Sequence, residues 1–396
     1  MSERAVPGID PVALLEELLR IDSVNPAMGG PGEREVAELL ASVLAGIGCR
    51  VTLPDGDRAD GRPNLIATLP GRPTRPVLLL EAHLDTVARP RQGSSVGRQG
   101  GRMHGRGACD TKGSAAAMVA AMARIAATAE HPSVVFAGTV DEEVAMAGSR
   151  ALVHQLPPVD GAIVGEPTSL LPVRVHNGLM RFRVVAHGRA AHTSRAHLGV
   201  NAIAAAARAV LAIEDELVPE LRARAHPLVG PALATAAVIH GGVAPNLVPE
   251  WCEVLVDRRL APGEDPADAL GEVDALLGRL RANGDQLTRE EPSVLLRPVE
   301  TPEDHELVRV AESVVASELD VPVRAGGAPF GTDASNLSGV GGIPCVVLGP
   351  GSIDQAHTAD EWVSTDEVVR ASRIYEQLVI RFSAAHGPSG PDGPRT

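Results

Sequence analysis

Apolar residues recur at helical spacing at the start of the chain. Leu14, Leu15, Leu18 and Leu19 follow Asp10-Pro11, which is typical of a helix cap with a first-turn proline. Asn25-Pro26 and the glycine-rich stretch 29–32 interrupt this pattern. We therefore expect two helices between residues 10 and 48, the second over about 33–46.

From residue 64 onward, short continuous apolar runs alternate with helical patterns. The runs predict strands over 64–69, 77–81, 133–140 and 161–165, and the patterns between them predict helices over 113–127 and 147–155. This order is typical of an α/β sheet with helices on both faces.

The segment from about 179 to 296 has a different order. Strands are expected over 180–187, 232–239, 251–257 and 293–296, with helices over 200–216 and 266–280. A βαββαβ order fits a small two-layer α+β domain of the ferredoxin-like kind. We therefore predict a larger domain in two parts, 1–178 and 297–387, interrupted by a smaller domain at 179–296. Residues 388–396, rich in Pro and Gly, are expected to form a disordered tail.

Composition narrows the possible partners and the compartment. The formal net charge of −14 argues against nucleic acid or an anionic membrane as a partner. Four widely spaced cysteines suit a reducing compartment and give no disulfide framework. The first residues lack an apolar signal core, and no run reaches the ~18 apolar residues of a membrane span. These features predict a cytoplasmic protein.

Candidate metal ligands occur in five short motifs along the chain. Two are imidazoles and the others are carboxylates, with no cysteine among them. Such a set suits one or two zinc-like ions with a coordination position left open for hydrolysis. A closed structural zinc site would consist mainly of thiolates. The candidates are His83 in 81–87, Asp110 in 105–113, Glu142 and Glu143 after Asp141, Glu166 in 165–168, and His357 in 355–359.

Three of these motifs directly follow predicted strands. His83, the Glu142-Glu143 pair and Glu166 each come within a few residues of a strand's end. Ligands of open α/β sheets bind outside the carboxyl ends of the strands, so these side chains can converge on one site.

Each motif also has a simpler interpretation. His83 and Asp85 could be a strand-end histidine and a cap, although Asp85 could equally orient the imidazole toward a metal. Asp110 precedes a helix and could be an N-cap, or its two oxygens could bridge two cations. Adjacent acids are usually a solvated turn, but Glu142 and Glu143 could also divide base and ligand roles.

Together the motifs, in this order, resemble the M20 metallopeptidases, in particular the group of acetylornithine deacetylase and succinyl-diaminopimelate desuccinylase. The resemblance covers nearly the whole chain. It implies a zinc-hydrolase-type mixed sheet interrupted by a lid domain through which members usually dimerise. It also implies two Zn²⁺ ions, for which Co²⁺ or Mn²⁺ can substitute.

The resemblance assigns a role to each matching position. Asp110 would bridge both ions, with His83 and Glu166 completing one site and Glu143 and His357 the other. Asp85 would orient His83, Glu142 would be the general base, and His192 of the lid would stabilise the oxyanion. Asn246, Arg258, Gly331 and Thr332 would contact the substrate, with Arg258 anchoring its carboxylate.

The implied reaction is hydrolysis of the amide bond of an N-acyl amino acid by a water that two zinc ions activate. A dipeptidase or carboxypeptidase using the same metal site is the alternative among hydrolases, so the substrate is a small N-acyl amino acid or a short peptide. The alternative from another class is a binding or scaffold protein that retains the fold. The complete set of candidate ligands and base favours an enzyme.

Overall fold

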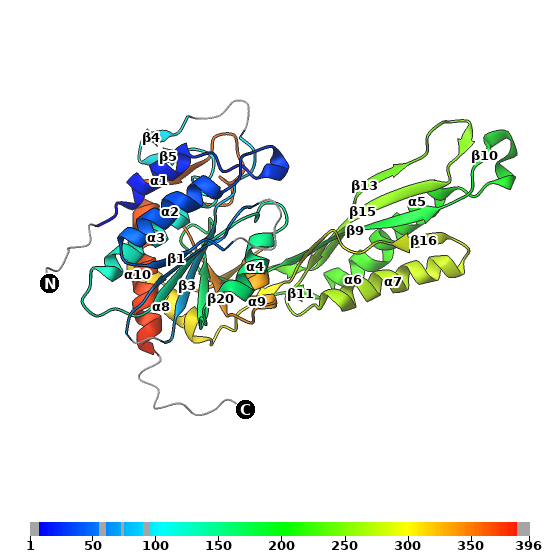
Figure 1. Ribbon diagram of the computed structural model, residues 1–396. Coiled ribbons are helices and arrows are strands. Elements are labelled where there is room, and N and C mark those ends of the chain that lie inside the picture. The colour runs from blue at the N-terminus through cyan, green and yellow to red at the C-terminus, as the bar shows by residue number, and fades with distance from the viewer. Residues whose placement is uncertain (1–7, 55–60, 73–74, 90–94, 386–396) are drawn as a thin grey trace. The chain divides into compact units, whose positions relative to one another are not determined.

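The computed structural model describes residues 8–54, 61–72, 75–89 and 95–385. The chain forms two compact units (Figure 1). The first contains residues 1–174, 301–326 and 332–396, and the second contains 175–300 and 327–331. Our domain boundaries at 178 and 297 and the tail at 388–396 stay predictions, and the tail lies outside the described residues.

The first unit is built on a mixed sheet. Its strands lie in the order β1-β2-β6-β3-β7-β20-β8, and β6, β3, β7 and β20 run parallel to one another. Their bounds are β1 Arg50–Thr52, β2 Leu65–Leu69, β3 Leu78–His83, β6 Val134–Thr139, β7 Gly161–Val164, β8 Val173–His176 and β20 Cys345–Val347. The three parallel pairings bring the carboxyl ends of these four strands to one edge of the sheet.

Helices cover both faces of this sheet. Alternate strand residues such as Leu78, Leu80 and Phe136 share one apolar core with α1, α2, α3, α8 and α10. On the other face, α4 and α9 pack together and contact β6 and β20. The helices are α1 Pro11–Arg20, α2 Arg34–Gly46, α3 Lys112–Ala126, α4 Ala147–Gln155, α8 Glu306–Leu319, α9 Ala334–Gly339 and α10 Thr365–Ala385. A small three-stranded sheet, β4 Gly97–Gln99, β5 Arg102–His104 and β21 Trp362–Ser364, and the 3-10 turn Pro26–Met28 complete the unit.

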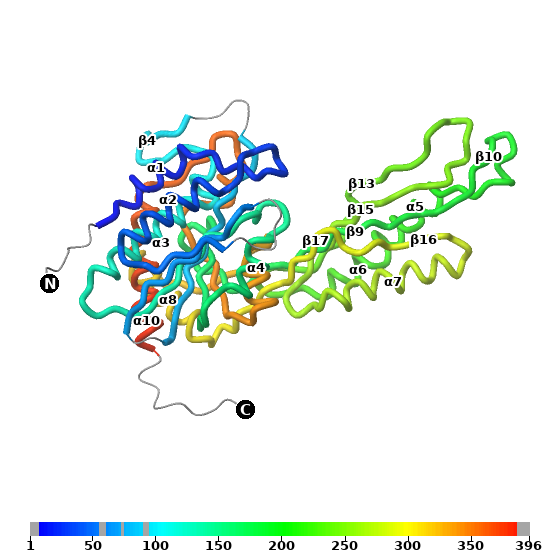
Figure 2. The backbone as a smooth tube through the Cα atoms, viewed as in Figure 1, coloured from blue at the N-terminus to red at the C-terminus, as the bar shows by residue number. Residues whose placement is uncertain are grey.

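The second unit is a two-layer α+β structure. Its antiparallel sheet has the order β13-β15-β9-β16, with β17 also paired to β9, and Figure 2 follows the chain through these strands. The strands are β9 Gly178–His187, β13 Leu233–Gly241, β15 Trp251–Leu260, β16 Gln286–Arg289 and β17 Val294–Leu296. The helices are α5 Ala202–Ala212, a π-helical turn Ile213–Leu217, α6 Val218–Arg222 and α7 Pro266–Ala282.

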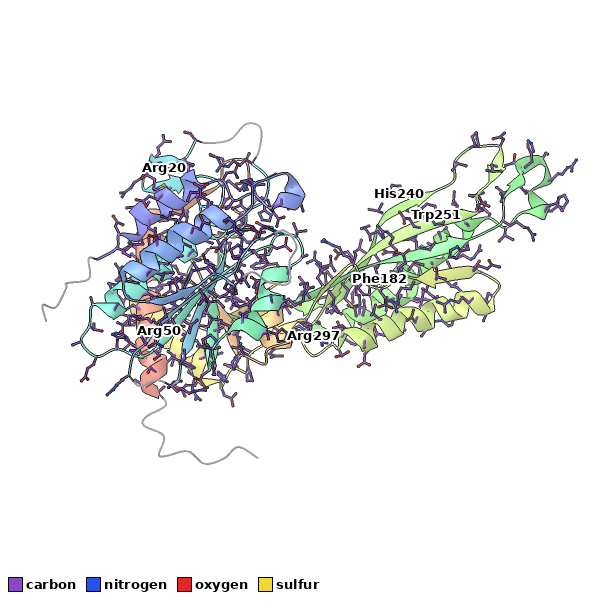
Figure 3. All side chains as sticks on the ribbon, in the orientation of Figure 1. Arg20, Arg50, Phe182, His240, Trp251 and Arg297 are labelled. Carbon is purple, nitrogen blue, oxygen red and sulfur yellow. The ribbon has the colours of Figure 1, made fainter. Side chains whose placement is uncertain are left out.

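The sheet of the second unit has one buried and one open face. Phe182 of β9 is buried in a core shared with the alanine-rich helix α5, whereas Trp251 of β15 is exposed (Figure 3). The remaining elements of the unit are short: β10 Ala191–His192 pairs with β14 Leu247–Val248, β11 Ala225–His226 pairs with β12 Gly230–Pro231, and a 3-10 helix spans Thr193–Leu198. Two further short strands, β18 Val299–Glu300 and β19 Gly326–Ala328, both pair with β8.

Every predicted helix and strand has an observed counterpart, with bounds that differ by a few residues. The helix expected over 200–216 differs in type, because it is α-helical only to Ala212 and continues as a π-helical turn. No element was predicted between 297 and 387, where the structure contains β18, α8, β19, α9, β20, β21 and α10. Among the described residues, no helix combines the length and apolar composition that a membrane crossing requires.

Candidate metal centre

The parallel strands of the first unit carry the predicted ligands to one edge. His83 is the last residue of β3, Glu142 and Glu143 lie in the turn after β6, and Glu166 follows β7 by two residues. Since β3 pairs in parallel with both β6 and β7, these three positions are neighbours by register. His357 lies in the loop after β20, the next strand of the same parallel set.

Asp110 lies at the centre of the cluster, between the two histidines. Its Oδ1 lies 2.9 Å from Nε2 of His83, and its Oδ2 lies 3.2 Å from Nε2 of His357. Each carboxylate oxygen therefore has a different imidazole beside it. A carboxylate with its oxygens divided in this way can bridge two cations.

The other two candidate ligands lie on opposite sides of Asp110. The Glu143 carboxylate is 3.0 Å from Nε2 of His357, and Glu166 Oε1 is 4.0 Å from Nε2 of His83. Ligand atoms of His83, Asp110 and Glu143 all lie within 4.8 Å of one another. The structure thus brings together all five predicted ligands, and their role in binding metal stays a prediction.

These donors fit divalent metal ions. Nitrogen and carboxylate oxygen without thiolate are the donors of open zinc sites. Burial raises the pKa of Glu166, and the nearby charge of Asp110 raises it further. The pKa of Glu143 is likewise raised, chiefly by burial. Closely spaced buried carboxylates repel one another, and a cation among them relieves both costs.

The two histidines favour the charged form in this setting. Burial lowers the pKa of His83, but hydrogen bonds to Asp110 and Asp85 outweigh it and raise the pKa well above its ordinary value. Hydrogen bonds to Asp110 and Glu143 raise the pKa of His357 to about 10. Despite its burial, Asp110 has a pKa below its ordinary value because both imidazoles donate to it.

Asp85 contacts both His83 and the acidic turn. His83 Nδ1 lies 3.0 Å from the backbone oxygen of Asp85 and 3.6 Å from its carboxylate. The carboxylate accepts hydrogen bonds from the backbone nitrogens of Glu142, at 3.0 Å, and Glu143, at 3.2 Å. Asp85 therefore holds the ligand imidazole mainly through its backbone and the turn through its side chain.

Sequence reasoning missed Asn25 as part of this site. Its Nδ2 donates to Asp85 at 2.8 Å and to Asp141 at 3.0 Å, although its side chain is fully buried. The Asn25-Pro26 pair signalled only the end of a helix, because a contact across 60 residues of chain leaves no local pattern.

Glu142 has the surroundings of a base. Burial raises the pKa of its carboxyl well above the ordinary value, and Glu166 raises it further, although the charge of His83 acts in the opposite direction. A carboxyl whose pKa moves toward neutrality can both accept and return a proton near pH 7.

His192 and Asn246 belong to the second unit and are exposed there. The backbone N–H of Ser194 donates to Nδ1 of His192 at 3.1 Å. Nδ1 is therefore an acceptor, and a neutral His192 carries its proton on Nε2. His192 also lines a hollow of about 490 Å³ together with Arg195 and Leu198. The backbone oxygen of Asn246 accepts from Thr193 at 3.1 Å.

Arg258 does not fit its predicted role as an anchor for the substrate. Its side chain is fully buried, and its guanidinium bonds Glu264 at 2.9 Å and the backbone oxygen of Arg259. Its Nε has no hydrogen-bond partner among the described residues, but a fully buried guanidinium presents no solvent-facing side to a carboxylate. Side chains alternate along β15, so Arg259 lies on the opposite, open face, where its side chain is 33% exposed and pairs with Asp257.

Gly331 and Thr332 lie in the loop before α9. Gly331 is half-buried and belongs to the second unit by its contacts, whereas Thr332 is buried and belongs to the first. Thr332 Oγ1 accepts from the backbone nitrogen of Ala334 at 3.2 Å, and its backbone oxygen accepts from Ser335 at 2.9 Å. Thr332 thus helps to start α9, and the substrate contact of both residues stays a prediction.

Comparison with known proteins identifies the class. A model of peptidase family M20/M25/M40 matches residues 79–381. The chain therefore belongs to this family and is a hydrolase, which confirms the predicted family and enzyme class. Family membership also disfavours the alternative of a non-catalytic scaffold.

The similar proteins include enzymes acting on acylated amino acids and on peptides. An acetylornithine deacetylase from Klebsiella pneumoniae (strain 342) is 34% identical over 320 residues, which cover 77% of this chain and 80% of that protein. Aminopeptidase PepT from Bacillus cereus ATCC 10987 is 21% identical, with a TM-score of 0.78 over 94% of this chain and 98% of that one. A dinuclear metal-binding M20 peptidase from Bacillus subtilis is 17% identical, with a TM-score of 0.71 over 94% and 97%. The two structural likenesses confirm the predicted fold class.

Proposed function

We propose that this protein hydrolyses the amide bond of N-acyl amino acids at a centre of two divalent metal ions, with Zn²⁺ as the expected ion. The observation that carries the proposal is the division of the Asp110 oxygens between His83 and His357, with Glu142 next to the ligand Glu143. The similarity to acetylornithine deacetylase favours an acylated substrate over a free peptide.

The residues divide the work as follows. His83, Asp110 and Glu166 would hold one ion, and Asp110, Glu143 and His357 the other. Bound there, the ions would lower the pKa of a water molecule toward ~7 and polarise the scissile carbonyl. Glu142 would take the proton of the attacking water and return it to the leaving nitrogen.

Residues of the second unit would recognise the reacting group and the substrate. His192 presents Nε2–H as a donor, which is the form needed to stabilise an oxyanion. Arg259, rather than the buried Arg258, would bind a substrate carboxylate, because its guanidinium is on the open face of the sheet.

The protein would act as a homodimer assembled through the second unit. β13 is the outer strand of its sheet, and Val238 and Ile239 on it are 40% and 50% exposed. Leu211 of the neighbouring helix α5 is 58% exposed. An apolar outer strand favours pairing with the same strand of a second copy.

The four cysteines are all buried and free, which supports a reducing, cytoplasmic location.

Turnover on a substrate panel tests the proposal. Metal-reconstituted protein would be assayed with N-acetyl and N-succinyl amino acids beside matching dipeptides, with and without a chelator. We expect chelator-sensitive release of the acyl group from at least one acylated substrate. Cleavage of the dipeptides alone would instead support the dipeptidase or carboxypeptidase alternative, and turnover that survives complete metal removal would contradict the metal centre.

A further inference from the structure

A buried ion pair between Arg106 and Glu361 connects two loops of the metal centre. Arg106 lies four residues before Asp110, and Glu361 lies four residues after His357. The two side chains are only 6% and 2% exposed. Neither residue is among the candidate ligands, so the pair needs another explanation.

The Glu361 carboxylate binds the backbone that carries Asp110. Its Oε1 accepts from the backbone nitrogens of Cys109, at 3.0 Å, and Asp110, at 3.2 Å. Its Oε2 pairs with Nη1 of Arg106. The position of the Asp110 backbone is therefore set by a carboxylate on the loop of His357.

Arg106 makes the reciprocal contact with the His357 loop. Its Nη2 donates to the backbone oxygen of Thr358, the residue after His357, at 3.1 Å. The backbone nitrogen of Gly105 also donates to the backbone oxygen of Glu361, at 3.0 Å. The two loops thus bind each other through both backbone and side chain.

The two histidine ligands have unequal support from the rest of the unit. His83 is 2% exposed and ends a strand paired on both sides, by β6 and β7. His357 is 51% exposed, lies in a loop and has a φ of 61°. A half-exposed loop residue with positive φ is costly to hold in one geometry, so its position depends on contacts such as those of Arg106 and Glu361.

We propose that Arg106 and Glu361 are positioning residues that set the affinity of the metal ion on the His357 side of the centre. They act by fixing the separation of Asp110 and His357, whereas His83 and Glu166 are placed by the sheet itself. This inference rests on the dinuclear metal centre of the proposed function.

The test is a Zn²⁺ titration of the metal-free full-length chain by calorimetry. Wild type would be compared with Glu361→Gln and Arg106→Gln, each of which removes one charge of the Arg106–Glu361 ion pair. Glu312→Gln is the matched control, because Glu312 is also a buried glutamate of the first unit. It pairs with Arg324 at 3.0 Å and accepts from the Ala325 nitrogen at 2.8 Å.

We expect wild type and Glu312→Gln to bind two ions. In Glu361→Gln and Arg106→Gln, one of the two ions should bind about 10–100-fold less tightly, a typical effect of removing a group that orients ligands, with at most about a 3-fold change for the other ion. In a His357→Ala background, Glu361→Gln should have no further effect on the remaining ion, which would locate the effect on the His357 side.

Three results would overturn the inference. Wild-type affinity for both ions in Glu361→Gln and Arg106→Gln would show that the ion pair does not position the ligands. Equal weakening of both ions, or equal effects of Glu312→Gln, would show a general loss of stability. A wild-type protein that binds fewer than two ions would overturn the dinuclear centre of the proposed function, and the inference with it.

Discussion

The carboxylate of Asp85 accepts a hydrogen bond from the backbone nitrogen of Glu142 at 3.0 Å. His83 is the last residue of β3, and this contact links the segment directly after it to the turn that follows β6. The segment that positions the first histidine therefore also positions the expected base.

Removing the Asp85 side chain should disturb both halves of this link. In Asp85→Ala the nitrogens of Glu142 and Glu143 lose their acceptor, so we expect kcat and metal affinity to fall about 10–100-fold. Asn25→Ala is the comparison, since it removes one donor to Asp85 but leaves the acceptors for the turn. It should lower the free energy of unfolding by about 1–3 kcal/mol with a smaller loss of kcat. Equal kinetic losses in the two variants would contradict the role of Asp85.

Substitutions of the adjacent residues Glu142 and Glu143 should have different effects on turnover and metal binding. Glu142→Gln should lower kcat by about 10²–10⁴-fold while both ions stay bound, because the variant loses only its proton acceptor. Glu143→Gln should lose metal, since it weakens a candidate ligand next to His357. Steady-state kinetics with metal analysis distinguishes them. Near-wild-type turnover in Glu142→Gln would mean that another group is the base.

Stability should depend on pH through Lys112, the only lysine of the chain. Burial, with the nearby charge of Arg89, lowers its pKa to about 7 from the ordinary 10.5. Between these values the folded state binds fewer protons than the unfolded state, so stability rises as pH increases from 7 to 10.5. Below pH 7 the full penalty for the buried charge remains.

The variant Lys112→Met removes this titration. Between pH 7 and 10.5, the unfolding free energy of wild type should rise by on the order of 3–5 kcal/mol relative to that of the variant. The variant also lacks the Lys112 hydrogen bonds to the backbone oxygens of Leu18 and Ile21, which shifts its stability separately from this titration. Urea unfolding of the metal-free proteins at several pH values measures the difference. Parallel pH profiles for the two proteins would show that Lys112 titrates near its ordinary pKa.

The neighbouring arginines of β15 should affect different quantities. Arg259→Met should raise KM for substrates with a free carboxylate at least tenfold and leave the unfolding free energy nearly unchanged. Arg258→Met, which removes a fully buried guanidinium from its contacts with Glu264 and the Arg259 backbone, should lower stability by about 1–3 kcal/mol. KM would be measured for both variants on substrates with a free carboxylate and on the matching amides, and unfolding free energy would be measured by denaturant titration. A selective KM effect of Arg258→Met would restore its original role.

An acidic residue on the outer strand of the second unit should prevent dimerisation. Ile239→Glu introduces a charge at an exposed apolar position of β13, so we expect a monomer by analytical ultracentrifugation together with reduced turnover. Val321→Glu is the control, because Val321 of the first unit is similarly exposed, at 49%. If wild type is a fully active monomer, the dimer proposal fails.

The periodicity of the sequence determined the α/β class, the inserted α+β segment and the positions of most helices and strands. All three were predictable because side-chain burial repeats every two residues on strands and about every 3.6 on helices. The convergence of the candidate site residues was also predictable from sequence, since His83, Glu142, Glu143 and Glu166 follow predicted strands whose carboxyl ends share an edge.

Tertiary structure decided which polar side chains support that set. Asn25 and Glu361 reach the centre across 60 and about 250 residues of chain, a separation that no local pattern records. The structure also separated Arg258, which is buried, from Arg259, which is partly exposed, because adjacent residues of a strand point to opposite faces. Only the packing of β15 on α5 and the contact with Glu264 show which of those faces is buried. The sequence determined the chemistry that the site contains, and the fold determined which residues hold it in place.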